Sequence, residues 1–193
     1  MGSRYDDAIW RLVPEEPGPP PAHLREFVAG LPFVERALDL GCGDGRLTTA
    51  LRAGAVAGAD VSAVALERAR RRLPDAELVL LEPDEPLPFS DNAFGLVLCA
   101  ETLEHVRDLQ LFLSEARRVL QPGGTLAVST PAHGRLTGAA ALALGLERRF
   151  HPLSPHIRFL TRRSLRALLH DLGFEPPTLR RRRGSLLAIA SRP

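Results

Sequence analysis

Short apolar runs alternate with segments of helical periodicity along most of the chain, and this alternation limits the fold more than any other feature. Five runs have the continuous apolar character of buried strands, at residues 36–40, 55–60, 77–81, 94–100 and 125–131. Amphipathic segments separate several of them, at residues 44–54, 63–73 and 109–120. Because strands joined by helical crossovers pair in parallel, the pattern predicts an α/β fold: a doubly wound, mostly parallel sheet with helices on both faces.

Local signals mark where some of these elements begin and end. Ser62 is suited to cap the helix expected over residues 63–73, because a serine hydroxyl can accept a hydrogen bond from a free amide of the first turn. In the last quarter of the chain, a helix is expected over residues 161–174, with Thr161 or Ser164 as its cap. Two strands follow it and meet near Gly184, close enough in sequence to pair as an antiparallel hairpin.

The domain organisation follows from where this pattern starts and stops. Residues 1–20 predict an N-terminal arm that carries Tyr5 and Trp10 and ends in a proline-rich connector, which cannot continue a helix. Residues 21–193 have the length of a single domain. Residues 131–160 form a long connection within it, and we expect this connection to cap the substrate side, because connections of that length inside compact domains are usually functional.

Composition argues against several classes of protein. The formal net charge of the 193 residues is only +2 and every basic residue is an arginine, so the overall charge indicates no nucleic-acid partner. The longest apolar stretch is about half as long as a membrane span. The N-terminus lacks the apolar core of a secretory signal, so we expect a cytoplasmic protein. Cys42 and Cys99 form no ligand cluster, and we therefore expect neither a disulfide nor a metal site.

The first predicted strand runs into a glycine turn, "GCGDG". In an open parallel sheet, ligands bind beyond the carboxyl ends of the strands, where the strand order reverses. Gly41 and Gly43 allow the backbone to approach a ligand closely, but Arg46 stands where the dinucleotide fingerprint requires its third glycine. Asp39 and Asp44 flank the turn and would repel a pyrophosphate in a partly desolvated site. The turn therefore favours a ligand that carries positive charge.

Further acidic residues follow the next two predicted strands. Asp60 ends the second strand, where a carboxylate can accept hydrogen bonds from both hydroxyls of a ribose. Glu82, Asp84 and Glu85 follow the third strand and offer acceptors for an exocyclic amine such as that of adenine. A cation, a ribose and an adenine occur together in S-adenosylmethionine, which we therefore predict as the cofactor.

Four motifs strengthen this prediction: "LDLGCGDG", "ADVS", "LPFSDNAFGLVLCAETLEHV" and "EARRVLQPGGTLAVSTP". The chain that carries them resembles the class I, seven-stranded and Rossmann-like S-adenosylmethionine-dependent methyltransferases over residues 34–175, and most closely the small-molecule branch that includes enzymes of ubiquinone and menaquinone biosynthesis. The resemblance implies a sheet of order 3-2-1-4-5-7-6 with the last strand antiparallel. It also implies these cofactor-binding residues: Asp39, Gly41, Cys42 and Gly43 in the methionine-side turn, Asp60 and Val61 at the ribose, Asp84 and Glu85 at the adenine, and Ala100 and Glu101 beside the methionine portion.

Some site assignments have alternatives. Glu82 competes for the adenine position, because family members often place the usual aspartate where this chain has Pro83. His105 and His151 are the candidate general bases, with His156 as an alternative to His151, since an imidazole can take a proton near neutral pH. His105 can equally orient the backbone beside the cofactor. We expect Glu104 to face solvent or to pair with an arginine.

The resemblance implies in-line transfer of a methyl group to a small, apolar or amphipathic acceptor, which requires mainly that both reactants are held in line in a dry pocket. One alternative is a nucleic-acid methyltransferase whose residues 180–183, all arginine, contact phosphates. The motif "CAET" argues against it, because it contains no Asn-Pro-Pro-aromatic signature for a flipped base. The second alternative is a non-catalytic, cofactor-binding partner subunit. Asp39 and Asp60 argue against that role, and no pattern indicates an oligomeric state.

Overall fold

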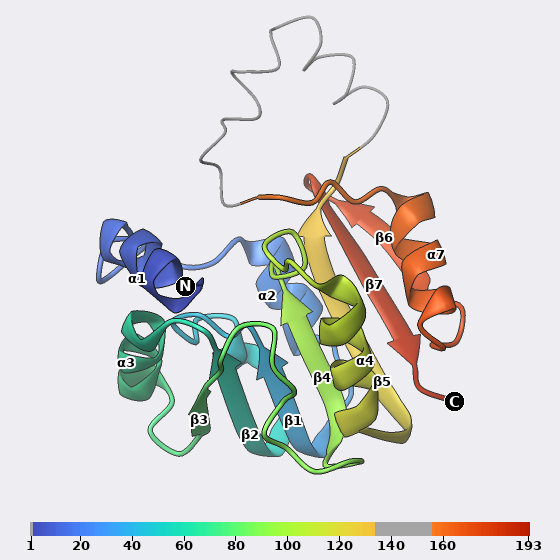
Figure 1. The fold of residues 1–193 in the computed structure, drawn as a ribbon, viewed down its shortest axis with the longest axis horizontal. Helices are drawn as coiled ribbons and strands as arrows, with labels where there is room; N and C mark the ends of the chain where they lie inside the picture. The colour runs from blue at the N-terminus through green and yellow to red at the C-terminus, as the bar shows by residue number, and fades with distance from the viewer. Residues whose placement is uncertain (1, 134–155) are drawn as a thin grey trace, which may run out of the picture.

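The protein is built around one mixed sheet of seven strands. The computed structural model describes residues 2–133 and 156–193 (Figure 1). The strands are β1 (Val34–Leu40), β2 (Ala53–Asp60), β3 (Glu77–Leu80), β4 (Phe94–Ala100), β5 (Leu120–Pro131), β6 (Thr178–Arg182) and β7 (Ser185–Ser191). Their order is β3-β2-β1-β4-β5-β7-β6, with β7 antiparallel to β5 and β6 and the other pairs parallel. The predicted fold class and strand order are confirmed.

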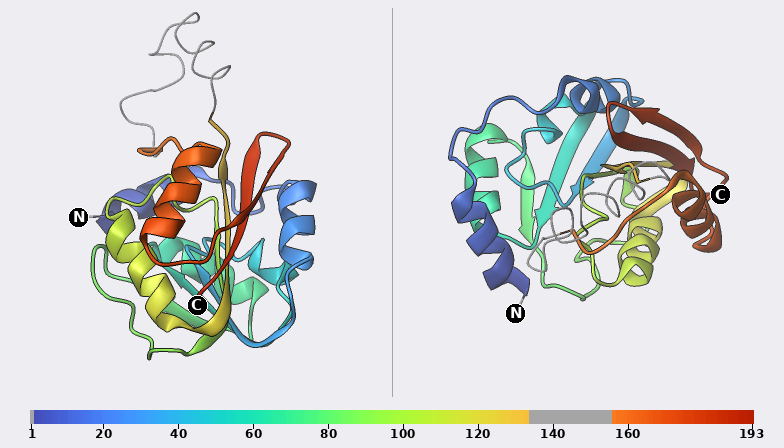
Figure 2. Two further views of the ribbon diagram at one scale, coloured as in Figure 1. Left: turned by 90° about the vertical axis from the view of Figure 1, so that its right-hand side faces the viewer. Right: turned by 90° about the horizontal axis from the view of Figure 1, so that it is seen from above.

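Helices cover both faces of this sheet. Among the described residues they are α1 (Gly2–Leu12), α2 (Ala22–Ala29), α3 (Ala63–Arg72), α4 (Leu109–Val119) and α7 (Arg162–Asp171). Figure 2 shows α4 and α7 together on one face and α2 on the other. The core is divided accordingly: Leu113 and Leu165 belong to one buried cluster, and Val28 of α2 belongs to a second. Neither α4 nor any other helix among the described residues is long and apolar enough to span a membrane.

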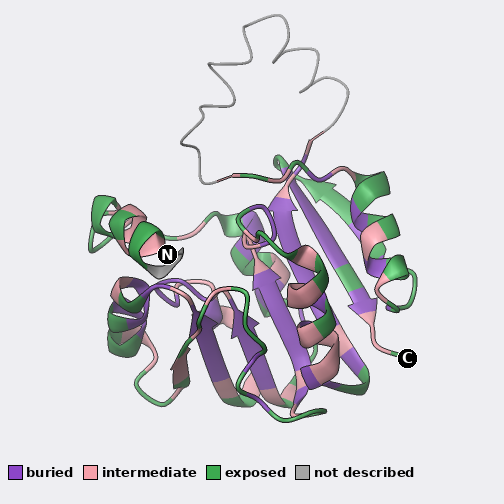
Figure 3. Ribbon diagram, in the orientation of Figure 1, coloured by how far each residue is buried: buried purple, intermediate pink, exposed green. Residues whose placement is uncertain are grey.

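The side chains of β1 show how the strands separate these two clusters. Leu38 and Leu40 belong to the cluster beneath α4 and α7, whereas Ala37 belongs to the cluster beneath α2. This alternation follows from the two-residue period of a strand. Figure 3 shows that the central strands are largely buried, as their continuous apolar sequences predict.

Several predicted element ends are confirmed. The Ser62 hydroxyl accepts a hydrogen bond from the amide of Ala65 and caps α3. Thr161 caps α7. The C-terminal hairpin turns at Arg183 and Gly184, whose φ angles are 47° and 90°, so both residues have the left-handed backbone that a tight two-residue hairpin requires.

The helix predicted over residues 44–54 is wrong. Only a short 3-10 helix, Thr48–Ala50, forms there. The strand β2 begins already at Ala53, because Ala53 pairs with Val34 at the start of β1. The segment between the glycine turn and Ala53 is too short to form an α-helix and also to lead the chain back to the start of β2.

The N-terminal arm also differs from the prediction, because most of it is the helix α1. This helix packs beside α3 at the carboxyl ends of the parallel strands (Figure 1). Asp7 fixes it there: its carboxylate accepts hydrogen bonds from the Ser62 hydroxyl at 2.6 Å and from the Val64 amide at 3.2 Å. The Arg68 guanidinium donates to the carbonyl oxygens of Val13 and Pro14, just after α1.

Candidate functional site

A cavity of about 630 Å³ lies at the carboxyl ends of the strands. Its wall is formed by the segments that follow β1, β2, β3 and β4, together with residues of α1 and α4. Strands β1 and β4 are neighbours in the sheet although they are not consecutive in the chain, so the cavity lies where the strand order reverses. Its volume is within the range of about 300 to 1,000 Å³ that small-molecule sites occupy.

The glycine turn after β1 forms one side of the cavity. Gly41 and Gly43 both line it, with φ angles of 84° and 55° that favour glycine. Both are also closely covered: a Cβ atom at Gly41 would collide with the Thr102 side chain, and one at Gly43 would come within 2.7 Å of the Trp10 ring. Glycine is therefore required here for its backbone conformation and for the close approach of neighbouring side chains.

Asp60 connects this turn to the end of β2. Its Oδ2 accepts a hydrogen bond from the Gly43 amide at 2.8 Å, and its Oδ1 accepts one from the Ser62 amide at 2.9 Å. The side chain lines the cavity although the residue is only 8% exposed, and burial raises the pKa of its carboxyl group to about 6. Each carboxylate oxygen can accept a second hydrogen bond, so Asp60 can also bind both hydroxyls of a ribose.

Asp39 lies behind the turn and is not part of the cavity wall. Its Oδ2 accepts a hydrogen bond from the Thr48 hydroxyl at 2.6 Å, whereas its buried Oδ1 has no hydrogen-bond partner among the residues that the structure describes. Burial raises the pKa of this carboxyl group to about 7. A buried acceptor without a partner is costly, and a cationic ligand nearby would offset that cost. The buried carboxyl group of Asp39 therefore fits a cofactor with an aminoacyl group and a sulfonium better than it fits a diphosphate.

The predicted cofactor residues are divided between the cavity wall and the layer behind it. Cys42 and Ala100 are not in the wall, and the Cys42 thiol packs against Gly58 on the far side of the turn. The two cysteines are both free and buried. The predicted residues that do line the cavity are Gly41, Gly43, Asp60, Val61, Asp84, Glu85 and Glu101.

The adenine assignment keeps both of its alternatives. Glu82 lines the cavity together with Asp84 and Glu85, and all three side chains are exposed. Asp84 has a φ angle of 61°, so the chain turns sharply at this residue. The choice of Asp84 and Glu85 over Glu82 as the adenine acceptors stays a prediction.

Asp44 has a structural role beside the glycine turn. It is 3% exposed and forms ion pairs with Arg46 at 2.9 Å and Arg72 at 3.2 Å. These pairs join the glycine turn to the end of α3. Asp44 is absent from the cavity wall, so its carboxylate stabilises the turn from outside.

The segment after β4 contributes two acids in different environments. Glu101 lines the cavity with a φ angle of 54°, and its Oε1 accepts a hydrogen bond from the Ser129 hydroxyl at 2.8 Å. Burial raises its pKa. The prediction that Glu104 faces solvent or pairs with an arginine is wrong: it is 1% exposed, accepts a hydrogen bond from the Thr130 hydroxyl at 3.0 Å, and has a pKa raised by burial to about 7.

The two candidate general bases have different outcomes. His105 lines the cavity, whereas His151 lies outside the described residues, as does most of the predicted cap over 131–160. Of the part of that cap that is described, Ile157 contributes to the cavity wall. The role of His105 as a base stays a prediction.

The sequence alone does not predict that apolar side chains form a large part of the cavity wall. This apolar part includes Tyr5, Ile9, Trp10 and Val13 at the N-terminal end of the chain and Leu111 and Phe112 on α4. Tyr5 and Trp10, which the sequence placed in an N-terminal arm, both lie in this wall. The sequence signal that could have predicted helix α1 is the four-residue spacing of its apolar side chains, as between Tyr5 and Ile9.

The arginines proposed as phosphate contacts lie away from this cavity. Residues 180–183 belong to the edge strand β6 and its turn, and none of them lines the cavity. Arg182 forms an ion pair with Glu26 at 2.7 Å.

Comparisons with known proteins agree with this geometry. Residues 38–128 match the family model described as a methyltransferase domain. A demethylmenaquinone methyltransferase of Tropheryma whipplei is 38% identical over 120 residues, which cover 59% of this chain and 50% of that protein. A ubiquinone biosynthesis O-methyltransferase of Cereibacter sphaeroides is 33% identical over 162 residues, which cover 79% of this chain and 65% of that protein. The chain thus spans about half to two thirds of the length of these curated relatives.

A solved structure shows the same fold. The chain matches a candidate methyltransferase from Bacillus halodurans with a TM-score of 0.73 and 19% identity, over 90% of this chain and 100% of that one. S-adenosylmethionine carries a positive charge, a ribose and an adenine, and these suit the carboxyl groups described above. From its sheet order, its glycine turn and these matches, the chain belongs to the class I family of S-adenosylmethionine-dependent methyltransferases.

Proposed function

We propose that the protein transfers the methyl group of S-adenosylmethionine to a small, apolar or amphipathic acceptor. The observation that carries this proposal is the charge of the cavity wall. Eight carboxyl-bearing residues line the cavity, and Arg107 is the only arginine among the described lining residues; the eight are Asp6, Asp60, Glu82, Asp84, Glu85, Glu101, Asp108 and Glu115. Such a wall repels diphosphate cofactors and attracts a sulfonium with an ammonium group.

The cofactor supplies a methyl group that is already activated by the positive charge of its sulfur. The protein therefore has to bind the cofactor and the acceptor, orient them, and exclude water from the cavity. Asp60 would hold the ribose, and the Gly41 and Gly43 turn would hold the methionine portion. Glu101, at the end of β4, would lie beside the reacting end of the cofactor. Holding both reactants in line can supply a large part of the rate enhancement, so a strong general base is not required.

The apolar part of the wall supports an acceptor with a ring or chain to bury. Trp10, Phe112 and Ile157 come from three separate segments and line the same cavity. Relatives of this chain are named as a demethylmenaquinone methyltransferase and as ubiquinone biosynthesis O-methyltransferases. We propose a similar acceptor class for this chain, with a ring hydroxyl as the favoured methyl acceptor.

Two measurements test the proposal in order. Isothermal titration calorimetry with S-adenosylhomocysteine is expected to show one site, whereas NAD and FAD are expected to give no heat of binding. Transfer of a labelled methyl group is then screened against short-chain quinols, simple phenols, fatty acids and a mixed RNA. Labelled quinol or phenol supports the proposal. Binding of a dinucleotide in place of S-adenosylhomocysteine, or labelling of RNA alone, would overturn it.

A further inference from the structure

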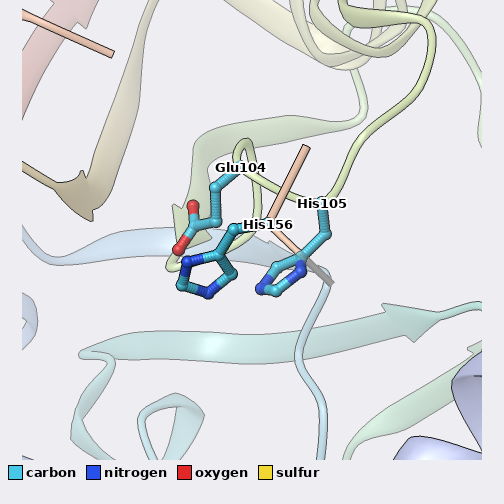
Figure 4. A group of neighbouring side chains, drawn as sticks. All are labelled: Glu104, His105 and His156. Carbon is cyan, nitrogen blue, oxygen red and sulfur yellow. The ribbon is translucent and has the colours of Figure 1, made fainter. Parts of the chain in front are cut away.

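A cluster of one carboxylate and two imidazoles lies beside the cavity. Glu104 and His105 follow β4, and His156 comes from the segment before α7. One potential ligand atom from each side chain lies within 4.8 Å of the other two. The rings of His105 and His156 are in edge contact, with centroids 4.8 Å apart. Figure 4 shows the carboxylate of Glu104 and the two rings pointing into one shared space.

Hydrogen bonds from outside the cluster hold these groups in place. The Thr130 hydroxyl on β5 donates to Oε2 of Glu104 at 3.0 Å, which fixes one carboxylate oxygen. The carbonyl oxygen of Glu104 accepts hydrogen bonds from the amides of Ile157 at 2.9 Å and Arg158 at 3.2 Å. These bonds attach the segment that carries His156 to the segment that carries His105. The arrangement therefore does not depend on a chance approach of two surface histidines.

The Arg158 side chain reinforces the same attachment. Its guanidinium donates to the carbonyl oxygens of Val106 and Arg107, which directly follow His105 in the chain. Glu104 itself is only 1% exposed, and Glu101 adds a second carboxyl group nearby. A buried carboxylate close to another acid is stabilised by a cation, and a multivalent cation would suit this position well.

The types of donor indicate which cation would fit. Two imidazole nitrogens and one carboxylate oxygen are typical ligands of zinc and of neighbouring transition metals, whereas calcium and magnesium favour shells of oxygen alone. Three protein ligands leave at least one coordination position for another molecule, as in catalytic zinc sites. Because His105 lines the cavity, a metal ion bound here would lie at the cavity wall.

We propose that Glu104, His105 and His156 bind one divalent transition metal ion of the zinc type, whose open coordination position takes a hydroxyl oxygen of the acceptor. This inference rests on the proposed function for its acceptor but not for its metal. A metal ion at this position would contradict the expectation of no metal site, which considered only the cysteines. It also reassigns His105, because an imidazole nitrogen that binds a metal cannot accept a proton as a general base.

The metal part is tested by titrating the untagged, EDTA-treated and dialysed protein with Co²⁺, whose visible absorption bands report its ligands and coordination number. We expect one equivalent to bind with the absorption of a four- or five-coordinate site, and Zn²⁺ to displace it. His105→Ala, His156→Ala and Glu104→Gln are each expected to weaken Co²⁺ binding by about 100-fold, since loss of even an outer-shell partner costs about 10- to 100-fold. His170→Ala is the matched control, because His170 is exposed on α7 and should not affect binding.

The outcomes separate this proposal from the proposed function. His156→Ala should retain the affinity of the native protein for S-adenosylhomocysteine, which shows that the variant is folded even if Glu104→Gln is not. Absence of Co²⁺ binding above the background of adventitious sites, or equal binding by the native protein and His156→Ala, overturns the metal site while leaving cofactor binding intact. If the ion binds but a simple catechol does not perturb the Co²⁺ spectrum, the acceptor part of the proposal is wrong.

Discussion

The indole ring of Trp10 lies directly against Gly43, so that a Cβ atom at position 43 would come within 2.7 Å of the ring. This contact joins helix α1, which lies outside the sheet, to the turn that forms one side of the cavity. The amide of Gly43 donates a hydrogen bond to Asp60. Gly43 therefore contacts helix α1 on one side and, on the other, the carboxylate that we assign to the ribose. The shape of the cavity therefore depends on the absence of a side chain at position 43.

Gly43→Ala is expected to weaken S-adenosylhomocysteine binding by about 1 to 3 kcal/mol, because the new methyl group displaces Trp10 and because the φ angle of 55° is unfavourable for alanine. Titration calorimetry gives the affinity. Gly123→Ala is the matched control, since Gly123 has a φ angle of 75° with no atom within 4 Å of its Cβ position and does not line the cavity. In a Trp10→Ala background the loss should be smaller; an equal loss would show that the Trp10 contact is not its cause.

Asp60→Ala is expected to weaken S-adenosylhomocysteine binding by about 1 to 3 kcal/mol, the range for hydrogen bonds to a charged group. The structure adds a second effect: the amides of Gly43 and Ser62 lose their acceptor, so Tm should fall as well. Asp60→Asn keeps one acceptor oxygen and should lose less Tm than Asp60→Ala. Glu67→Ala, on the exposed side of α3, should change neither quantity. An unchanged dissociation constant for Asp60→Ala would remove this residue from the ribose site.

The stability of the protein is expected to depend on pH through Asp39 and Asp60. Burial raises their pKa values from 3.8 to about 7 and about 6. A raised pKa in the folded state means that protonation favours folding, so this contribution is fully present below the unfolded pKa and is lost as the pH rises through the folded pKa. The free energy of unfolding that these two groups contribute should therefore fall from about pH 4 to about pH 7. Urea denaturation across this range measures the slope.

Asp39→Asn isolates the larger part of that pH dependence. At about pH 8, the variant is expected to be more stable than the native protein by roughly 1 to 3 kcal/mol, because no charged carboxylate has to be buried. Its affinity for S-adenosylmethionine should be lower, because a negative charge near the cationic end of the ligand is lost. Asp75→Asn, in an exposed turn, is the control. A variant that is less stable at that pH and has an unchanged slope would contradict the assigned pKa.

Much of the fold could be predicted because its signals are local. The apolar runs of β1 and β4, the Ser62 cap and the turn at Gly184 each depend on a few neighbouring residues. The strand order did not come from such signals; it came from the resemblance to a family. The helix expected over residues 44–54 failed because its limit is set by the pairing of Ala53 with Val34, which are far apart in sequence.

The parts of the site that could not be predicted are those that depend on tertiary contacts. Nothing in "ETLEHV" shows that Glu104 is buried, because that follows from its contacts with Thr130 and with the segment after His156. Trp10 meets Gly43 because tertiary contacts, such as the hydrogen bond from Ser62 to Asp7, attach α1 to α3. By contrast, Asp60 could be assigned from the sequence, since the end of a parallel strand leads directly to the ligand crevice.

Arg118 on α4 holds in place the segment that joins residues 82–85, the candidate adenine-binding residues, to β4. Its guanidinium donates to the carbonyl oxygens of Leu87 at 2.9 Å and Phe89 at 2.8 Å. It also forms ion pairs with Glu115 at 2.7 Å and with Asp91 at 2.7 Å. The Glu115 carboxylate in turn accepts a hydrogen bond from the Leu87 amide at 2.8 Å. One side chain thus positions a segment whose preceding residues, 82–85, line the cavity.

Arg118→Met keeps most of the aliphatic stem but removes these hydrogen bonds, so it is expected to lower the free energy of unfolding by about 1 to 3 kcal/mol. Because the segment becomes less ordered before it can bind, affinity for S-adenosylhomocysteine should also fall, and amide hydrogen exchange over residues 81–89 should become faster while exchange in β5 and β7 changes little. Arg70→Met is the control, because Arg70 pairs with exposed Glu67 at 3.0 Å in α3 and such surface pairs contribute little. Unchanged exchange over residues 81–89 would show that backbone contacts, and not Arg118, order this part of the cavity.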